Sequence, residues 1–160
     1  MAISYTIAQH AYAFQSKLLA ANGGEHIVNL FLTADRDNGT IRGIGAWKDF
    51  DRYTEANAPV GFAGVIREQA ADGNYYVEVT SAADAVIIIE VPEIAEDYNT
   101  KFKNKKNFYN KQGSTVRAYV LHKGDIFELS AEGFTTTPTA ASIGKAVSAQ
   151  AASGKLVIAS

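Results

Sequence analysis

The sequence predicts a mainly β fold: a single antiparallel β-sandwich or barrel of about eight short strands, with an N-terminal arm or short helix and a long loop. Turn-forming clusters of Gly, Asn and Asp recur along the chain, for example at 22–24, 37–39 and 71–74. Between these clusters stand short runs rich in Val, Ile, Tyr and Phe, which favour strands. This alternation is typical of sandwiches and barrels and not of helical bundles.

Eight runs have the length and composition expected of strands. They are residues 26–33, 60–66, 74–80, 84–91, 115–121, 125–130, 145–149 and 155–159. The tail at 135–154 is rich in Thr, Ala and Ser, and a strand follows it, so we expect an ordered loop and hairpin there.

The N-terminal stretch fits two patterns. One helical face would carry Ile7, Ala11, Phe14 and Leu18. Residues 3, 5 and 7 alternate instead as they would in a strand. We expect an extended arm that leads into one short helix within residues 1–25, followed by a single β domain over residues 26–160. Residues 34–59 are polar and Gly-rich, and this composition predicts a long loop that leaves the sheet.

Composition excludes several classes of protein. The chain has 160 residues, a formal net charge of -2 and no cysteine. It therefore has neither a disulfide framework nor thiolate metal ligands, and no global charge that would attract nucleic acid or an anionic membrane. The longest apolar run, "AVIIIEV" at 85–91, is far shorter than the roughly eighteen residues of a membrane span. We expect a protein without a classical secretion signal or membrane contact, assembled in a cytoplasm.

The stretch "TVRAYVLHKGDIFELSAEGF" at 115–134 contains a histidine and a carboxylate three residues apart. If Lys123 and Gly124 form a two-residue turn, His122 faces Asp125 at the solvated tip of a hairpin. A hydrolytic triad would need a nucleophile beside the histidine, and no Ser, Cys or Thr lies there. We therefore interpret the stretch as a surface hairpin and not as an active site.

No other motif indicates catalysis or a cofactor. The three histidines, at 10, 26 and 122, lack the spacing of a metal site, and no phosphate-binding loop occurs. Seventeen acidic residues can be paired in too many ways to identify a catalytic dyad. We predict no catalytic residue, no cofactor and no metal, and hence a protein that is not an enzyme.

Two stretches have the composition of binding surfaces. "KFKNKKNFYNK" at 101–111 holds five lysines interleaved with aromatic residues, as single-stranded nucleic-acid binders do, although acidic residues at 90–98 would offset its charge. It fits a solvated loop, a polyanion site or a site that docks on an acidic protein surface. "GAWKDFDRY" at 45–53 clusters Trp47 with Phe50 and Tyr53, which fits either an interface or an anchor for the long loop.

The C-terminal half resembles the small β-rich head decoration, or cement, proteins of tailed bacteriophages. The resemblance lies in "VRAYVLHKGDIFELSAEGF", in Pro138, in "IGKAV" at 143–147 and in the final "SGKLVIAS". It implies a non-enzymatic virion protein that binds the outer capsid surface. The partner would be the major capsid protein, the protein would often be a symmetric homo-oligomer, and nucleic acid is not an expected partner.

On this interpretation the capsid contacts fall on the arm, the long loop and the lysine-rich stretch. The predicted contact residues are Tyr5, His10, Phe14, Trp47, Phe50, Lys103, Lys105 and Lys106. Two alternatives remain: a module that binds polyanions or nucleic acid through 101–111, and a carbohydrate-binding β module. The rings available to the latter are Tyr75, Tyr76, Trp47 and Tyr119.

Overall fold

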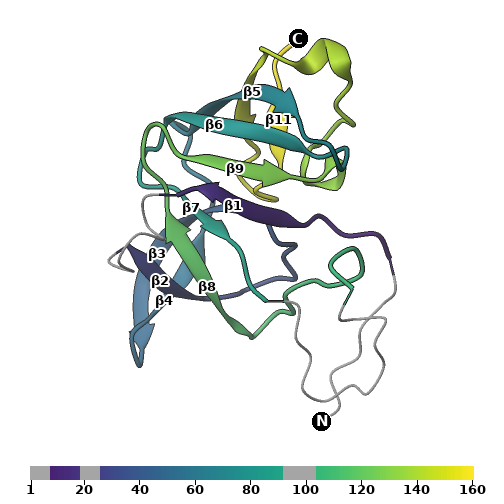
Figure 1. The fold of residues 1–160 in the computed structure, drawn as a ribbon. Coiled ribbons are helices and arrows are strands. Elements are labelled where there is room, and N and C mark those ends of the chain that lie inside the picture. The colour runs from purple at the N-terminus through teal and green to yellow at the C-terminus, as the bar shows by residue number, and fades with distance from the viewer. Residues whose placement is uncertain (1–7, 19–25, 92–103) are drawn as a thin grey trace.

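The computed structural model describes residues 8–18, 26–91 and 104–160, and in them the chain forms eleven strands in two sheets (Figure 1). In Figure 1 one sheet occupies the upper half of the molecule, the other the lower half, and β1 lies between them. The helical content of the described residues includes two short 3-10 turns, η3 (Ala131–Gly133) and η4 (Ala140–Ser142). The expectation of a mainly β fold is confirmed.

The first sheet has six strands in the order β1-β9-β6-β5-β10-β11, and every neighbouring pair is antiparallel. Its strands are β1 (Ala13–Lys17), β5 (Ala63–Gln69), β6 (Tyr75–Ser81), β9 (Ile126–Leu129), β10 (Ala146–Ala149) and β11 (Leu156–Ile158).

The second sheet is a closed barrel in the order β2-β4-β3-β7-β8. Its strands are β2 (Ile27–Phe31), β3 (Ile41–Asp49), β4 (Arg52–Ala56), β7 (Val86–Ile88) and β8 (Thr115–Val120). All pairs are antiparallel except β2 and β4, which are parallel. The expected all-antiparallel arrangement therefore fails at one pair.

Strand β7 contributes to both hydrophobic cores. Val86 and Ile88 belong to a cluster made of barrel residues, whereas Ile87 belongs to a larger cluster that also contains residues of the six-stranded sheet. Successive side chains of a strand point to opposite faces, so a strand with a core on each side must be apolar at every position. This explains the unbroken apolar run around β7.

Each of the eight predicted runs overlaps one strand, but three strands were not predicted. The first is β1. Residues 8–18 contain no helix, and within them β1 pairs with the edge of β9, so the expected short helix does not form there. Residues 1–7 and 19–25 of the predicted arm and helix lie outside the described residues. Leu18 is buried while Phe14 is 40% exposed, so these two residues of the expected apolar helix face do not lie in one buried surface. Pairing with the sheet edge has outweighed the local helical pattern.

The predicted long loop at 34–59 is wrong, because most of it is the hairpin of β3 and β4. Its glycines suggested a loop, yet they permit close approach of the strands. A Cβ on Gly43 would lie 2.7 Å from the carbonyl oxygen of Asn57, and one on Gly45 would lie 2.5 Å from that of Thr54. The register shifts between Ile44 and Trp47 at the same place, as expected for an irregular, Gly-containing strand.

The predicted hairpin at 115–134 is also wrong. The turn exists, since Asp125 N donates to the His122 carbonyl at 3.0 Å, but it connects the two sheets. Strand β8 pairs with β2 on one edge and with β7 on the other, and β9 pairs with β1 on one edge and with β6 on the other. Neither strand has a free edge, so β8 and β9 cannot pair with each other. Asp125 is buried and accepts a hydrogen bond from His122 N at 2.9 Å, so its role is to close this crossover.

A buried ionic cluster joins the barrel to the turn between β10 and β11. Glu55, on β4, accepts hydrogen bonds from Arg36 Nε at 3.1 Å and from Arg42 Nε at 3.0 Å, and its side chain has no solvent exposure. Arg36 and Arg42 each donate a further hydrogen bond to the Ala152 carbonyl, at 3.1 and 2.9 Å. The two arginines thus connect one carboxylate in the barrel to the backbone of the other sheet.

Substitution of Gly154 should be far more costly than substitution of a glycine in open space. Gly154 has φ +73°, and a Cβ there would lie 2.3 Å from the Ile41 carbonyl oxygen. A left-handed non-glycine residue costs about 1–2 kcal/mol, and forced overpacking adds about 1–3 kcal/mol. We expect Gly154→Ala to lower the unfolding free energy by about 2–5 kcal/mol in urea titrations. Gly113→Ala is the matched control, because Gly113 has φ +86° and nothing near its Cβ position. Equal losses for the two variants would contradict this account.

Replacing Glu55 should leave the buried Arg42 and the partly buried Arg36 without their shared anion. Burial raises the pKa of Glu55, but hydrogen bonds from Arg36 and Thr33 and the charge of Arg42 outweigh burial and hold this pKa below its usual range. The stabilisation is therefore complete above the unfolded pKa, about 4.3, and is lost as pH falls through the lower folded pKa.

We expect Glu55→Gln to cost about 3–5 kcal/mol near neutral pH and to reduce the loss of stability on acidification, measured by urea unfolding across pH. The control is Glu78→Gln, which breaks the more exposed pair with Arg67 and should cost less than about 1 kcal/mol. A Glu55→Gln variant as stable as the control would show that the cluster contributes little.

Candidate functional site

The described members of the predicted contact set fall into two separate surfaces. His10, Phe14, Lys105 and Lys106 come together and are called the arm surface below. Trp47 and Phe50 stand on the hairpin of β3 and β4, whose end is called the hairpin tip. Tyr5 and Lys103 lie outside the described residues.

The arm surface joins segments that are about ninety residues apart in the chain. The Lys105 ammonium lies 4.7 Å from the ring centre of Tyr12 and 4.9 Å from that of Phe14. His10 N donates to the Lys106 carbonyl at 2.7 Å, so the backbone of the lysine-rich segment is also held to the residues just before β1. The rings shield the alkyl stem of the lysine and attract its charge.

His10 is fixed on this surface by two further contacts. Its Nδ1 lies 2.6 Å from Asp37 Oδ1, and its ring stacks on Tyr109 with the ring centres 4.5 Å apart. Asp37 Oδ2 also accepts a hydrogen bond from Ala11 N at 3.0 Å. His10 is thus a half-buried orienting residue, and the outward chemistry of the arm surface comes from Phe14 and the lysines.

Two carboxyl groups lie against this surface. Glu128, on β9, is paired in register with Phe14, and Asn74 Nδ2 donates to Glu128 Oε1 at 2.8 Å. Asn74 Oδ1 in turn accepts a hydrogen bond from the Tyr12 hydroxyl at 3.1 Å. Asp72, in the turn between β5 and β6, accepts from Asn74 N at 3.2 Å. Asn74 thereby connects β9 and its own turn to Tyr12, the residue just before β1.

The two carboxyl groups have pKa values that move in opposite directions. Burial, and then the hydrogen bond to Asp72, raise the pKa of Glu128. The hydrogen bond from Glu128, followed by the backbone of Asn74, lowers the pKa of Asp72. Glu128 is 9% exposed, whereas Asp72 stands on an exposed turn, so burial separates the two groups in the direction expected.

The hairpin tip presents apolar side chains on a strained turn. Phe50 and Asp51 form its two-residue loop with φ 45° and 63°, the left-handed region that type I′ turns require at both positions. Asn and Gly favour this region, and a bulky phenylalanine does not. Phe50 is nevertheless 87% exposed and Trp47 is 55% exposed, so the strain is not offset by burial. Backbone strain of this kind concentrates at functional sites.

The sides of the hairpin tip are braced by aromatic and charged neighbours. Trp47 packs edge-on against Tyr53 with the ring centres 5.2 Å apart. Lys48 and Arg52 lie over the Phe31 ring at 4.3 and 5.7 Å. Arg52 also pairs with Asp49 across the turn. The two strands that carry Phe50 are therefore held by contacts between their own side chains and with Phe31.

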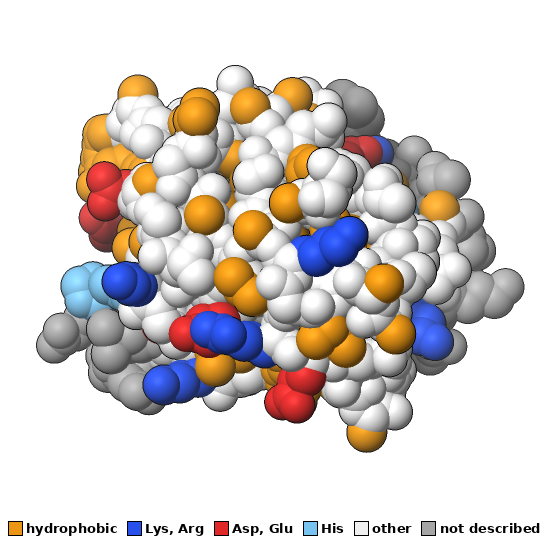
Figure 2. Space-filling model, turned by 90° about the horizontal axis from the view of Figure 1, so that it is seen from above, with side chains coloured by type: hydrophobic (Ala, Val, Ile, Leu, Met, Phe, Trp, Pro, Cys, Tyr) orange, Lys and Arg blue, Asp and Glu red, His pale blue; other side chains and the backbone are white. Residues whose placement is uncertain are grey.

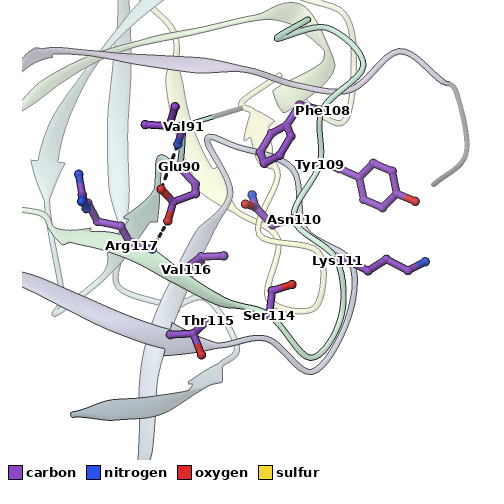
Figure 3. Close-up of a pocket in the computed structure, with 10 residues that line it drawn as sticks. All are labelled: Glu90, Val91, Phe108, Tyr109, Asn110, Lys111, Ser114, Thr115, Val116 and Arg117. Carbon is purple, nitrogen blue, oxygen red and sulfur yellow. Dashed lines mark hydrogen bonds between the residues drawn. The ribbon is translucent and has the colours of Figure 1, made fainter. Parts of the chain in front are cut away.

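A pocket of about 510 Å³ opens between β8 and the segment 104–111 (Figure 3). Glu90, Val91 and Arg117 form one wall, and the stretch from Phe108 to Lys111 forms the other. The Glu90 carboxylate accepts hydrogen bonds from the backbone of Arg117 at 2.9 Å and of Val91 at 3.0 Å. A hydrogen bond to Tyr119 and the charge of Glu90 raise the pKa of Arg117. The described lining contains no histidine, and its one carboxylate, that of Glu90, is occupied by hydrogen bonds from backbone amides.

Charges in the lysine-rich region are balanced by acids. Lys111 Nζ lies 3.6 Å from Asp35 Oδ2, and Lys105 lowers the pKa of both Asp72 and Glu128. On the face seen from the side of the six-stranded sheet, basic side chains are scattered and form no continuous patch (Figure 2). Such a distribution gives little net field for a phosphate backbone.

The rings proposed for carbohydrate binding do not share a surface. Tyr75 and Tyr119 are 5% and 4% exposed and belong to the larger core cluster. Tyr76 is half-buried, and Trp47 stands on the hairpin tip. A stacking platform needs exposed rings side by side, and these four residues do not provide one.

Sequence reasoning missed Tyr12, Asp72, Asn74 and Glu128, which surround the arm surface. Nothing in their spacing links them, because they meet only once the register of β1, β9 and β6 is known. For the described residues, no group of three His, Asp or Glu side chains is placed to hold a metal ion. Within those same ranges, no helix is long and apolar enough to cross a bilayer.

Comparison with known protein families, curated proteins and solved structures gives no match for this chain. The resemblance to phage decoration proteins therefore rests on the C-terminal residues given in the sequence analysis. The structural observations that bear on function are those at the arm surface and the hairpin tip.

Relieving the strain of the hairpin tip should stabilise the protein. We expect Phe50→Asn to raise the unfolding free energy by about 0.5–1 kcal/mol, because asparagine tolerates positive φ and the exposed ring contributes little packing. Ala83→Gly is the matched control for strain, since Ala83 is also exposed with φ 50°, in the turn before β7. Urea unfolding measures both variants. A destabilised Phe50→Asn protein would show that the ring supports the fold.

Proposed function

We propose that this protein is a non-enzymatic structural component of a virus particle that binds the outer surface of a capsid built from another polypeptide, the major capsid protein. The observation that carries the proposal is Phe50, 87% exposed on a left-handed turn that disfavours phenylalanine. An exposed ring kept at a cost in stability is explained by a partner that buries it. The resemblance of the C-terminal half to decoration proteins supplies the kind of partner.

The energetics of such a contact fit a decoration role. Burying one phenylalanine removes about 150 Å² of apolar surface from water, which is about 4 kcal/mol before the costs of association. Trp47 adjoins it, and tryptophan is among the residues most often found at interface hot spots. The arm surface, with Phe14, Lys105 and Lys106, gives a second and more polar contact. Two modest contacts, repeated over many copies on a shell, hold more firmly than either alone.

Binding of nucleic acid or another polyanion is the less favoured alternative. Lys105 and Lys111 both lie close to acidic groups, which reduces the field that phosphates would meet. Carbohydrate binding is disfavoured by the burial of Tyr75 and Tyr119. Docking on a protein surface requires neither an unbalanced basic stripe nor a ring platform.

The first test is the number of copies of this chain per copy of the major shell protein in purified particles, measured by quantitative mass spectrometry. A decoration role predicts a simple ratio set by the symmetry of the shell. Absence of the chain from particles would overturn the proposal.

The second test assigns the contact. We expect Phe50→Ser and Trp47→Ser each to weaken binding to undecorated particles at least tenfold, because a hot-spot truncation costs about 2 kcal/mol or more. Val60→Ser is the control, since Val60 is 96% exposed but lies outside both surfaces. Co-sedimentation over a range of concentrations measures the affinity. Equal binding by all three variants would remove the hairpin tip from the contact.

A further inference from the structure

Strand β1 has one free edge. It stands at the end of the strand order of the six-stranded sheet, and among the described strands it pairs only with β9. In Figure 1 it runs between β9 on one side and β7 and β8 on the other. Its residues from Phe14 to Lys17 are all exposed, whereas a strand that is packed on one face exposes only every second residue.

The ladder between β1 and β9 shows which backbone groups the free edge presents. Ser130 N donates to the Tyr12 carbonyl at 3.0 Å, so Tyr12 and Ser130 form a hydrogen-bonded pair. Such pairs alternate with non-bonded pairs along an antiparallel ladder, so Phe14 is bonded to β9 while Ala13 and Gln15 are not. The N–H and C=O groups of Ala13 and Gln15 therefore point away from β9.

The pairing of β9 with β6 supports this assignment. Val79 N donates to the Asp125 carbonyl at 2.8 Å, so every second residue of β9 counted from Asp125 bonds to β6. A strand in the middle of a sheet bonds to its two neighbours alternately, so Glu128 bonds to β1. Glu128 is the register partner of Phe14, as the first observation requires.

A groove of about 230 Å³ runs along this free edge. Its lining includes the four consecutive residues 12–15 and the segment 89–91 that follows β7. Successive side chains of a strand point to opposite faces, so a groove that contacts four residues in a row lies at the edge and not on one face. The outward backbone groups of Ala13 and Gln15 therefore face the groove.

The opposite edge of the same sheet is covered. Leu156, on β11, forms a parallel bridge with Phe134, and Thr135 N donates to the Leu156 carbonyl at 2.9 Å. Proteins cover sheet edges because an unpaired edge is a template for another strand. Within the described residues the edge of β1 has no such cover, and its regular part ends where the register shifts between Gln15 and Lys17.

The side chains around the groove select the charge of a partner. Lys105 and Arg117 line it, and the Lys105 ammonium lies 4.9 Å from the ring centre of Phe14. The one carboxylate of the described lining, that of Glu90, already accepts hydrogen bonds from the backbone of Val91 and Arg117. A single acidic side chain beside the two cations gains at short range, without the extended field that a phosphate backbone needs.

The groove also offers apolar contact. Ile89 and Tyr119 line it, and both pack in the larger core cluster together with Ala13. The side chains of a strand added at this edge would alternate between two faces. Apolar side chains suit one face and acidic side chains the other.

We propose that the free edge of β1 binds an extended segment of the shell protein as an additional strand, in which small apolar side chains alternate with acidic ones. This inference rests on the proposed function and deepens it by naming the chemistry that the partner presents to the arm surface. Main-chain hydrogen bonds to Ala13 and Gln15 supply affinity, and Lys105 and Arg117 supply the preference for acidic side chains.

The test is an NMR titration of the isolated, isotope-labelled protein with two short synthetic peptides, one of alternating Val and Glu and one of alternating Val and Lys. We expect the Val-Glu peptide to shift the amide signals of Ala13 and Gln15 and to slow their hydrogen exchange, because both amides gain an acceptor. The Val-Lys peptide should bind at least about tenfold more weakly, because its charges face two cations.

Three results of this titration would overturn the proposal. The first is the absence of any response of the two amides to the Val-Glu peptide. The second is equal affinity for the two peptides. The third is a shift of the same amides with protein concentration alone, which would show that a second copy of this chain pairs with the edge.

Two variants of Gln15 separate the backbone edge from the side chain. Gln15→Pro removes the outward N–H and places a ring in the groove, while the hydrogen bonds to β9 remain. We expect it to weaken binding of the Val-Glu peptide at least about fivefold. Gln15→Ala is the matched control, because it keeps the N–H, and it should bind as the unaltered protein does.

Urea unfolding checks that both variants fold, and equal peptide binding by the two folded variants would remove the edge from the contact. If Gln15→Pro does not fold, hydrogen exchange at Ala13 and Gln15 in the unaltered protein decides the question. The titration uses no particles, so its failure is distinguishable from absence of the chain from particles, which would overturn the proposed function.

Discussion

The position of the barrel relative to the six-stranded sheet depends on the carboxylate of Glu55. It has no solvent exposure, and it satisfies two arginines that also reach the backbone of the turn between β10 and β11. Without it, the buried Arg42 and the partly buried Arg36 would lie beside each other with no anion between them, a state that costs several kcal/mol. With it, the side chains of Glu55, Arg36 and Arg42 form a hydrogen-bonded cluster of fixed geometry. Apolar packing between two sheets tolerates sliding, whereas hydrogen bonds from fixed guanidinium groups do not.

The backbone around this cluster is equally constrained. Ile41 N donates to the Gly154 carbonyl at 2.9 Å, and Ala58 N donates to that of Ala151 at 3.0 Å. The turn between β10 and β11 is thus bonded to the barrel by main chain as well as by side chains. Ile87 and Tyr119 pack into the core that the barrel shares with the six-stranded sheet. Together these contacts fix the support from which the hairpin tip projects.

Local composition was sufficient to predict where most strands lie, because β-branched and aromatic runs between turn residues suit a pleated, buried surface. It could not predict pairing. "TVRAYVL" and "DIFELS" look like two halves of a hairpin, yet each edge of β8 and β9 is taken by other strands. Gly43 and Gly45 looked like loop residues because the sequence does not show which carbonyl oxygens approach them. Strand β1 was missed because its partner, β9, is more than a hundred residues away.

The sequence could predict the hairpin tip better than the arm surface, because the residues of the tip are neighbours in the chain and those of the arm surface are not. Trp47 and Phe50 stand out in the sequence because each is a large apolar residue within a polar stretch, and the structure leaves both exposed. Glu128 stands out only in three dimensions, where Asn74 from the turn between β5 and β6 donates a hydrogen bond to it. The Glu55 cluster fixes how the barrel, which carries the hairpin tip, meets the turn between β10 and β11, whereas the contacts of Glu128 lie within the six-stranded sheet and the turn beside it. Each surface is therefore built by its own contacts, local in the sequence for the hairpin tip and distant in the sequence for the arm surface.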